Sequence, residues 1–453
     1  MKNTWLVKDK SFYKTLFSLA LPIALQNLIT FAVNFADNVM VGTLVEVDIS
    51  AVYMGRQIAT VLQCLTNGIG MTMLVLIAQY WGRKDIQPIK RIAVMGLRIA
   101  FYLGVIYSAV SFFFAPQILS VLTSDQEVVR AGIPYLRITA FSYLFFSITQ
   151  ALLYALRGVE NAKFGMRLSF LTLAVNIGFN YILIFGHLGA PSLGIKGAAI
   201  ATLLARIVEC ITVLIYVFFK EKRLLLRFHS LTLRSGILLR DMVRCGIPLL
   251  GGEIVWAVNT FFQSAAIGRF DEKGMAAFSI TIMLSNLVYV WASGLASAVG
   301  VITGKTVGRG EFEKMKQYAK TLQVLFLFVG LLSAALILLI RGPFISFYNV
   351  SPETVCMAKQ LMVVLALAMA GTCYQMVGLA GLVKSGGDTK FVMINDSIHV
   401  FLIIIPATVL AIYLNAPAWV VFACLKCDQV LKCFVAVVKI NRFRWMKKLT
   451  RDA

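Results

Sequence analysis

The sequence predicts an all-α integral membrane protein whose twelve transmembrane helices form two parallel six-helix lobes around a central cavity. First, 59% of the 453 residues are hydrophobic and only 14% are charged, whereas a soluble domain of this size carries roughly a quarter charged residues. Second, uncharged stretches recur that reach or approach the roughly 20 residues a helix needs to cross the hydrocarbon. Third, the two halves of the chain repeat. Together these observations predict a duplicated helical membrane domain.

The predicted spans follow the apolar stretches in order. The first stretch is too long for a signal peptide and is followed by further spans, so we interpret it as the first helix of the mature protein. Leu, Ile and Phe fill many of these stretches without strict alternation, which favours helices over barrel strands. The expected spans lie near residues 14–42, 50–81, 92–114, 130–156, 165–186, 195–219, 241–268, 275–304, 319–341, 355–383, 391–413 and 416–438.

The repeat has a register that can be followed along the chain. At an offset of 226 the pairs include Pro22 with Pro248, Gly42 with Gly268 and Gly68 with Gly294; at 227 they include Arg157 with Lys384 and Met166 with Met393. One insertion across half the chain is what a duplicated unit should show. An even number of helices in each half makes the repeat parallel. We therefore expect an N-terminal lobe (1–219), a cytoplasmic linker (220–240) and a C-terminal lobe (241–453), an architecture typical of transporters.

The basic residues predict the orientation. The formal net charge is +22, but 31 of the 43 Lys and Arg fall in the tails and in the loops on one side of the predicted membrane, seven fall on the other side and five within spans. This is the positive-inside bias. It places both termini in the cytoplasm of a multi-pass protein of a bacterial-type cell membrane, and it argues against a nucleic-acid partner.

Enzyme signatures are missing from the sequence. The run from Gly300 to Thr306 has three residues between its glycines, where a phosphate loop needs four. No HExxH motif occurs, and the three histidines are far apart in the sequence. We therefore expect no enzymatic activity, no cofactor and no metal beyond a coupling Na⁺, and an ion gradient is the simplest energy source for transport.

The polar residues within spans are the candidates for function, because an ionisable side chain at membrane depth is costly unless it faces a cavity, a partner or an ion. Asp37 lies toward the outer end of the first span, where it either serves such a role or caps the helix at the interface. Asn176 and Asn180 share one face of the fifth span. Their amides suit Na⁺ or a proton-carrying acid, or hydrogen bonds between helices.

The second half carries two further acids within its spans. Glu253, in the seventh span, has no basic residue within a helical turn, so we expect it to be unpaired and able to carry a proton. Asp396, in the eleventh span, has His399 three residues later as a candidate partner. Both acids are expected to line the cavity of the C-terminal lobe and to bind substrate or protons.

Other charges within spans are expected to find partners. Arg206 and Glu209 are three apart and should neutralise each other. Arg56 is expected to snorkel or to pair across helices. Lys426 and Asp428 do not share a helix face, so each needs another partner.

The ordered motifs of the chain resemble those of the multidrug and toxic compound extrusion (MATE) family. They extend over nearly the whole sequence, and the combination of their order and spacing is specific for this family. The resembling segments are Leu21-Pro22-Ile23-Ala24-Leu25-Gln26-Asn27, Asp37-Asn38-Val39-Met40-Val41-Gly42, Gly82-Arg83, Asn176-x-x-x-Asn180, Gly197-Ala198-Ala199-Ile200-Ala201-Thr202 and Gly386-Gly387-Asp388-Thr389-Lys390.

This resemblance implies secondary active efflux, in which cationic or amphipathic drugs or toxins leave in exchange for entering H⁺ or Na⁺. It also implies a coupling-cation site at Asp37, Asn176, Asn180 and Thr202. In one branch of the family the second polar position of span five is Asp; Asn180 leaves this site with one carboxylate, which slightly favours H⁺. Glu253 resembles the acid of a Glu-x-x-Trp found in some bacterial members.

Three other classes of membrane protein predict features that can be compared with this sequence. A lipid-linked oligosaccharide flippase of the same superfamily would share the two-lobe plan, and it is the alternative function. A membrane-embedded enzyme would need a catalytic constellation, and a carrier of the major facilitator type would need a different motif after the second span. We expect a monomer in the lipid bilayer with small-molecule partners.

Overall fold

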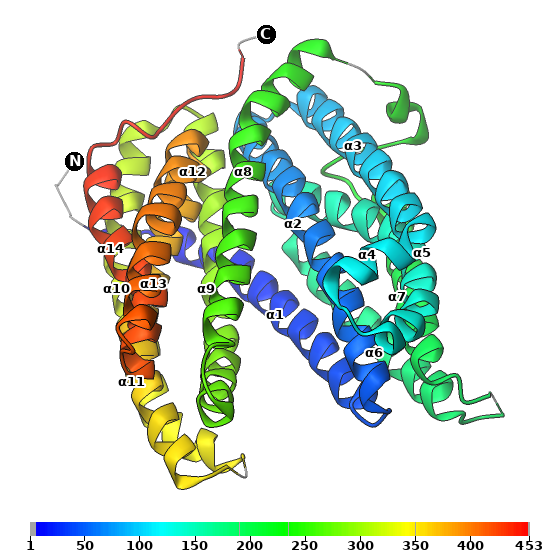
Figure 1. The fold of residues 1–453 in the computed structure, drawn as a ribbon. Coiled ribbons are helices and arrows are strands. Elements are labelled where there is room, and N and C mark those ends of the chain that lie inside the picture. The colour runs from blue at the N-terminus through cyan, green and yellow to red at the C-terminus, as the bar shows by residue number, and fades with distance from the viewer. Residues whose placement is uncertain (1–5, 190, 234, 349, 452–453) are drawn as a thin grey trace. The chain divides into compact units, whose positions relative to one another are not determined.

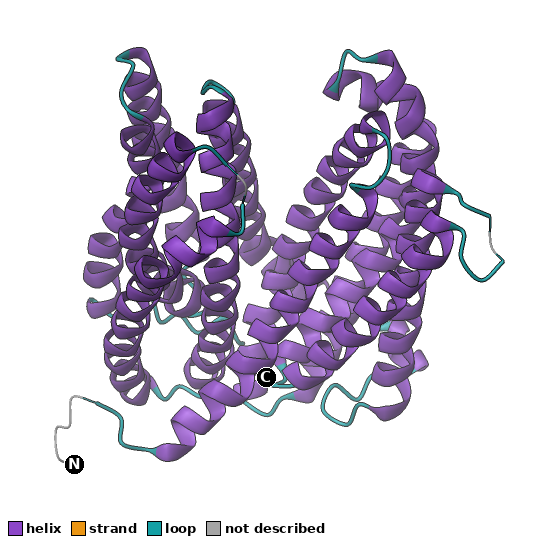
Figure 2. Cartoon of the chain, turned by 90° about the horizontal axis from the view of Figure 1, so that it is seen from below, coloured by secondary structure: helices purple, strands orange, loops and turns teal. Residues whose placement is uncertain are grey.

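The computed structural model describes residues 6–189, 191–233, 235–348 and 350–451, and the regular elements within these ranges are all helices (Figures 1 and 2). Arg234 of the predicted linker lies outside them. The α-helices are α1 (Lys10–Val41), α2 (Glu46–Gly82), α3 (Ile86–Phe113), α4 (Ala115–Leu122), α5 (Gln126–Gly158), α6 (Ala162–Phe185), α7 (Gly194–Ile215), α8 (Gly236–Ile267), α9 (Glu272–Gly308), α10 (Phe312–Ser346), α11 (Pro352–Gln375), α12 (Thr389–Ile398), α13 (Ile405–Tyr413) and α14 (Ala418–Asn441).

Three π-helical segments and one 3₁₀ turn complete the described chain. A π-helix over Tyr216–Lys220 continues α7, and a second over Met376–Lys384 continues α11. A third, His399–Ile404, joins α12 to α13, so that residues 389–413 form one continuous span. The 3₁₀ turn, Phe228–Thr232, lies in the connection that precedes α8.

Each of the twelve predicted spans overlaps one long helix, and the all-α membrane class is confirmed. In the part of the chain that is described, eleven helices are long and apolar enough to cross a membrane. The twelfth, α14, has 24 residues but carries Lys426, Asp428 and Lys432 in its middle. These charges lower its apolar character; Lys426 and Lys432 bond to side chains of neighbouring helices, and Asp428 pairs with Lys432 on α14 itself.

The helices form two compact units that do not coincide with the two halves of the sequence. The first unit comprises Met1–Ala24 and Ile247–Ala453, and the second comprises Leu25–Gly246. Helix α1 therefore begins in the first unit and ends in the second. Helix α8 begins in the second and ends in the first. Phe12 at the start of α1 packs on Tyr318 of α10, with ring centroids 4.2 Å apart.

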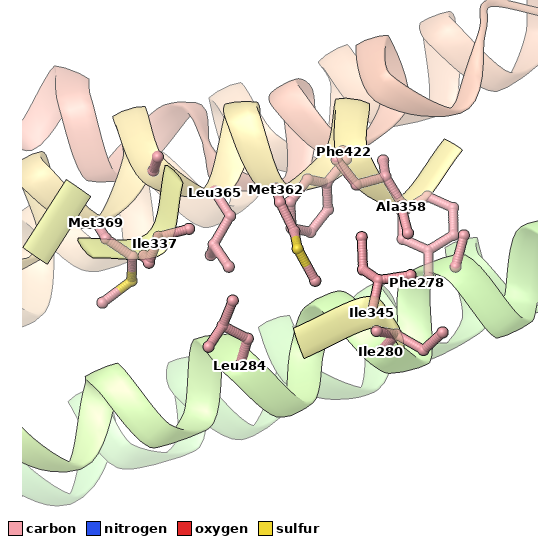
Figure 3. Packing of buried hydrophobic residues seen from close by; sticks show 13 residues of the cluster. Phe278, Ile280, Leu284, Ile337, Ile345, Ala358, Met362, Leu365, Met369 and Phe422 are labelled. Atoms are coloured by element: carbon pink, nitrogen blue, oxygen red, sulfur yellow. The ribbon is translucent and has the colours of Figure 1, made fainter. Parts of the chain in front are cut away.

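The core of the first unit is built between α9, α10, α11 and α14 (Figure 3). Phe278 of α9 and Phe422 of α14 meet edge to face with ring centroids 5.7 Å apart. Met362 and Leu365 of α11 lie fully buried beside them. Because lipid tails are as apolar as these side chains, close van der Waals packing is what holds such helices together in a membrane.

In the second unit, glycines bring the helices into close contact. A Cβ on Gly70 of α2 would lie 2.1 Å from the ring of Tyr154 on α5, and one on Gly96 of α3 would lie 2.2 Å from the sulfur of Met73. Small residues at such crossings let membrane helices approach closely. In the first unit, Gly294 of the repeat is placed likewise, since a Cβ there would lie 2.7 Å from Ala24 of α1.

The extra residue of the second half lies within a helix. Helices α5 and α11 begin at Gln126 and Pro352, still 226 apart, whereas Arg157 and Lys384 near their ends are 227 apart. The added residue therefore falls between residues 352 and 384, where α11 passes into the π-helix Met376–Lys384. Since a π-helix takes up more residues per turn than an α-helix, it accommodates the insertion without breaking the span.

The C-terminal segment packs back onto the turn between the π-helix Met376–Lys384 and α12. Trp445 is fully buried, and the Lys447 amide donates to the Gly386 carbonyl at 2.7 Å. Gly387, with φ of 105°, lies against the Lys447 carbonyl. Asp388 accepts hydrogen bonds from Lys439 at 2.7 Å and Lys447 at 2.8 Å. Burial alone would raise the pKa of Asp388, but the two lysines lower it below its usual 3.8.

An analogous arrangement closes the turn between α5 and α6 in the second unit. The Asn161 amide donates to the Tyr216 hydroxyl at 3.0 Å and to the Glu221 carboxylate. Arg223 donates to the carbonyls of Val159 and Glu160 at 3.0 and 2.8 Å. In both units, therefore, the segment that follows the sixth span of the half is hydrogen-bonded to the turn between the fourth and fifth spans of that half.

Candidate functional site

Three of the four residues predicted to form the coupling site meet in the second unit. Asn180 of α6 donates from its amide nitrogen to Asp37 Oδ1 at 2.5 Å and to Asn176 Oδ1 at 3.3 Å. The two asparagines lie one helical turn apart and are 2% and 1% exposed. The Asp37 side chain is 14% exposed. A carboxylate is thus held against a buried pair of amides.

The fourth residue, Thr202, lies on α7 and is half-buried. Helix α7 packs closely on α6, since a Cβ on Gly197 would lie 2.3 Å from the Leu183 carbonyl oxygen. Among the described residues, Thr202 makes no hydrogen bond to Asp37, Asn176 or Asn180. The threonine is on a neighbouring helix but outside the hydrogen-bonded cluster.

Arg56 of α2 is a member of this site that the sequence did not assign to it. Its Nη2 lies 3.7 Å from Asp37 Oδ2, and its Nη1 donates to the side chain of Asn38. Tyr135 of α5 packs beside it, because Gly55 leaves room for the tyrosine ring. The signal that could have found Arg56 is an arginine within a span with no acid on its own helix face.

Arg206 of α7 is the next positive charge near Asp37. Its Nη1 forms an ion pair with Glu209 at 2.7 Å, as predicted from their spacing. Its guanidinium also lies 4.8 Å from the centre of the Phe146 ring. Arg206 therefore has a carboxylate and an aromatic partner of its own.

The acids of the second half lie in the first unit, and each has a lysine partner. Glu253 of α8 lies 3.8 Å from the ammonium of Lys384. The expectation that Glu253 is unpaired is therefore wrong, because its partner comes from a segment more than a hundred residues away in sequence. Its side chain is 19% exposed, and that of Lys384 is 14% exposed.

Asp396 pairs with Lys432 of α14 at 2.9 Å, and Lys432 also pairs with Asp428 at 3.0 Å. The expected partner, His399, instead places its Nδ1 2.8 Å from the Asn395 carbonyl oxygen. The pairing of Asp396 with His399 is therefore wrong, since the histidine ring turns toward its own helix backbone. Lys432 thus joins two carboxylates from two helices.

Hydrogen bonds extend this ionic group across α14 and α11. Gln429 donates to Asp428 at 2.8 Å and accepts from Thr372 and Gln375, each at 3.0 Å. Lys426 finds its partner in Gln263 of α8, to which it donates at 2.9 Å. The charges of α14 are therefore satisfied by protein groups.

Metal-ligating groups are not assembled here: residues 6–189, 191–233, 235–348 and 350–451 contain no group of three or more His, Cys, Asp and Glu placed to hold a metal ion. The polar sites are ion pairs and amide clusters. Carboxylates, amides and lysines of this kind can bind protons, small cations or charged groups of a ligand.

Comparison with known proteins gives one consistent result. The model of the family described as MatE matches residues 22–182 and 248–410, one match in each half. The structure of a MATE protein in complex with MaL6 is 20% identical in sequence and superposes with a TM-score of 0.86, covering 95% of this chain and 97% of that one.

Two further solved structures share the fold. An outward-facing multidrug resistance MATE transporter of the MOP superfamily is 20% identical with a TM-score of 0.86, covering 95% of this chain and 96% of that one. A MOP superfamily transporter from Pyrococcus furiosus, described by a reversed polarity of its binding pocket, is 21% identical with a TM-score of 0.85, and 95% of each chain is covered.

Proposed function

This chain belongs to the MATE family of membrane transporters, and on that premise we propose that it is a cation-coupled multidrug efflux antiporter. It exports cationic or amphipathic organic compounds across the cytoplasmic membrane in exchange for H⁺ or Na⁺. It acts as a monomer with both termini in the cytoplasm. The bias of its basic residues toward one side supports that orientation.

One observation carries the proposal: the carboxylate of Asp37 on α1 accepts a hydrogen bond from the amide of Asn180 on α6, between two membrane helices. Placing a carboxylate among membrane helices is energetically unfavourable unless the carboxylate faces a cavity, a partner or a bound ion. The amide donor stabilises the ionised acid. A cation that binds the Asp37 carboxylate can replace this hydrogen bond. The site therefore has the chemistry of an ion-coupling centre.

Coupling follows if the cation and the drug favour different conformations. A cation bound at Asp37, Asn176, Asn180 and Thr202 from outside should favour the state with low drug affinity, so that the drug leaves. Return to the inward state then carries the cation to the cytoplasm. Such linkage is worth about 1–3 kcal/mol and is reciprocal, so bound drug weakens cation binding by the same factor.

The acids of the first unit are proposed to serve the substrate or to carry protons. Glu253 is within reach of Lys384, and Asp396 of Lys432. A cationic drug can compete with either lysine for its carboxylate. A proton can also compete with either lysine by binding the carboxylate, and the lysine then loses its ionic partner.

The same lysines support the alternative of an anionic substrate, such as a lipid-linked oligosaccharide carried by a flippase. Lys384, Lys426 and Lys432 all lie within or at the end of membrane helices of the first unit. The carboxylates of Glu253, Asp396 and Asp428 argue against it because they neutralise Lys384 and Lys432, although Gln263 accepts a hydrogen bond from Lys426 without neutralising it.

The test is transport of a cationic dye into inverted vesicles under imposed H⁺ and Na⁺ gradients, applied separately. Dye accumulation driven by either gradient supports antiport and identifies the ion. If neither gradient drives it, and the drug affinity of the protein depends on neither pH nor Na⁺, the proposal is wrong. Transfer of a fluorescent lipid-linked sugar in the same vesicles would then support the flippase.

Orientation is tested independently by cysteine labelling. Single cysteines placed in 46–48 and 271–273 should react with an impermeant reagent added to intact cells, and cysteines in 220–240 should not. Strong external labelling of 220–240 would reverse the proposed topology.

A further inference from the structure

Both oxygens of the Asp37 carboxylate face donors in the second unit. Asn180 donates to Oδ1 at 2.5 Å, and the Arg56 guanidinium lies 3.7 Å from Oδ2. The second guanidinium nitrogen of Arg56 donates to Asn38, the neighbour of Asp37 on α1. Arg56 is thus fixed across two consecutive side chains, with its charge beside the carboxylate.

We propose that Arg56 is a resident countercation of Asp37, which excludes Na⁺ from this site and makes H⁺ the coupling ion. This inference rests on the proposed antiport. Arginine keeps its proton at all physiological pH values, so the pair is neutral before any ion arrives. Either cation would enter a site whose negative charge is already balanced, but only a proton forms a covalent O–H bond with the carboxylate that offsets the loss of the ion pair; Na⁺ would have to rely on electrostatic attraction that Arg56 already cancels.

The other groups that face Asp37 do not change this balance. Arg206 of α7 is paired with Glu209 at 2.7 Å. Tyr135 of α5, whose ring packs against Gly55 beside Arg56, is an uncharged phenol. Asn176 and Asn180 of α6 are neutral amides. The charge that compensates Asp37 is therefore that of Arg56.

Ligand geometry also distinguishes the two ions. Na⁺ needs several oxygen ligands, but Asn180 presents its nitrogen to the acid. The Asn180 oxygen is buried and has no hydrogen-bond partner among the described residues. A proton needs one oxygen of Asp37 only. Once protonated, Asp37 can donate to the Asn180 oxygen when that amide turns over, which satisfies both groups.

The proposed step moves one proton and no other atom. A proton from outside binds a carboxylate oxygen of Asp37, and the acid becomes neutral. Arg56 then loses its ionic partner and keeps the contact with Asn38. On the cytoplasmic side the proton leaves, and the pair between Asp37 and Arg56 forms again.

Na⁺ binding to the purified protein tests this directly. In equilibrium binding with radioactive Na⁺, wild type should bind at least about tenfold more weakly than Arg56→Gln, because a full charge near the site is removed. Arg56→Lys keeps the charge and should bind as weakly as wild type. The double variant Asp37→Asn with Arg56→Gln should lose the gained binding. Arg130→Gln, an exposed arginine on α5, is the control for loss of one charge and should match wild type.

Equal Na⁺ affinity in wild type and Arg56→Gln, or tight binding by Arg56→Lys, would overturn the inference. Thermal unfolding in detergent checks that each variant is folded, and Arg56→Lys keeps the test valid if Arg56→Gln does not fold. Dye transport separates this inference from the proposed function. Transport by wild type driven by Na⁺ contradicts the role of Arg56 and leaves antiport intact. Absence of any gradient-driven transport contradicts antiport, while the binding comparison still reports on Arg56.

Discussion

The first helix of each half carries one acid within its span, but the two acids lie at different depths. In the repeat register, Asp37 of α1 corresponds to Gln263 of α8, and Glu253 of α8 corresponds to Asn27 of α1. The ten residues between these positions amount to about 15 Å along a helix. The two halves have therefore kept the same arrangement of helices, whereas the position of the acid along the first helix has diverged.

The partners of the two acids also differ. In the second unit, Arg157 at the end of α5 donates to Gln26 at 2.8 Å. Its repeat counterpart Lys384 pairs with Glu253. In each half, therefore, a basic residue at the end of the fourth span bonds to the first helix, but at neighbouring positions of the repeat register, since Gln26 corresponds to Gly252 and not to Glu253. Asp37 has no such inherited partner and uses Arg56. The two acids therefore differ both in their position along the first helix of each half and in their basic partners.

The largest expected effect is that of Asp37→Asn, which should abolish dye transport driven by an ion gradient. The substitution keeps the side-chain volume, so the protein should still fold, but Arg56 loses its ionic partner and detergent stability should therefore fall. Glu46→Gln, an exposed acid at the start of α2, is the control and should transport normally. Transport by Asp37→Asn at the wild-type rate would show that the difference between the two units has no role in coupling.

The next largest effect is on stability. Lys432→Met should destabilise the protein by about 3–5 kcal/mol, because Asp396 and Asp428 would lose the buried cation that they share. Thermal unfolding in detergent measures this change. Adding Asp396→Asn to the same chain should recover part of the loss.

A matched control for this prediction is Lys359→Met, since Lys359 is exposed on α11. It should leave the unfolding temperature nearly unchanged. An equally small effect of Lys432→Met would mean that the ionic group of α12 and α14 is not a stabilising element of the first unit.

Glu253→Gln should have a more moderate effect, on substrate preference. Export of monovalent cationic drugs should fall by about fivefold, the equivalent of the roughly 1 kcal/mol that two charges gain at 4 Å in water. Export of neutral drugs should change less, because these compounds gain no Coulomb attraction. Parallel transport assays of both classes provide the comparison.

A structural role for Glu253 predicts another pattern. Equal losses for cationic and neutral drugs would show that its pair with Lys384 supports the fold or relays protons. Combining Glu253→Gln with Lys384→Met would then restore transport if the unpaired lysine were the cause.

The smallest effect concerns the C-terminal segment. Asp388→Asn should lower stability at neutral pH by about 0.5–1 kcal/mol, since the pairs with Lys439 and Lys447 are partly solvated. The pKa of Asp388 is lowered in the folded protein, so its contribution is fully present above the usual value of 3.8. It is lost as the pH falls through the lower folded value. Unfolding curves of the two proteins should therefore converge in acid, and a difference that persists there would contradict this assignment.

The apolar frame was predictable from sequence because each span is a local property of about 20 residues. The cluster of Asp37 with Asn180 and Asn176 was also predictable, from helical spacing and from the family resemblance. The ion partners were not: Arg56 with Asp37, Lys384 with Glu253, and Lys432 with Asp396 each join different helices. Which residues meet across two helices depends on how each helix is rotated and placed, and no local pattern records this. The division of α1 and α8 between the two compact units was missed for the same reason.

The prolines of α1 and α8 give these two helices a mechanical property. Pro22 and Pro248 each lie two residues or fewer from a boundary between the compact units, at Ala24 and at Gly246. A proline has no N–H, so the carbonyls of Ser18 and Arg244 lack the usual donor four residues ahead. The helix can flex at such a position without breaking a backbone hydrogen bond. We therefore expect each repeated first helix to bend most easily beside its proline, close to the residue where the chain passes from one compact unit to the other.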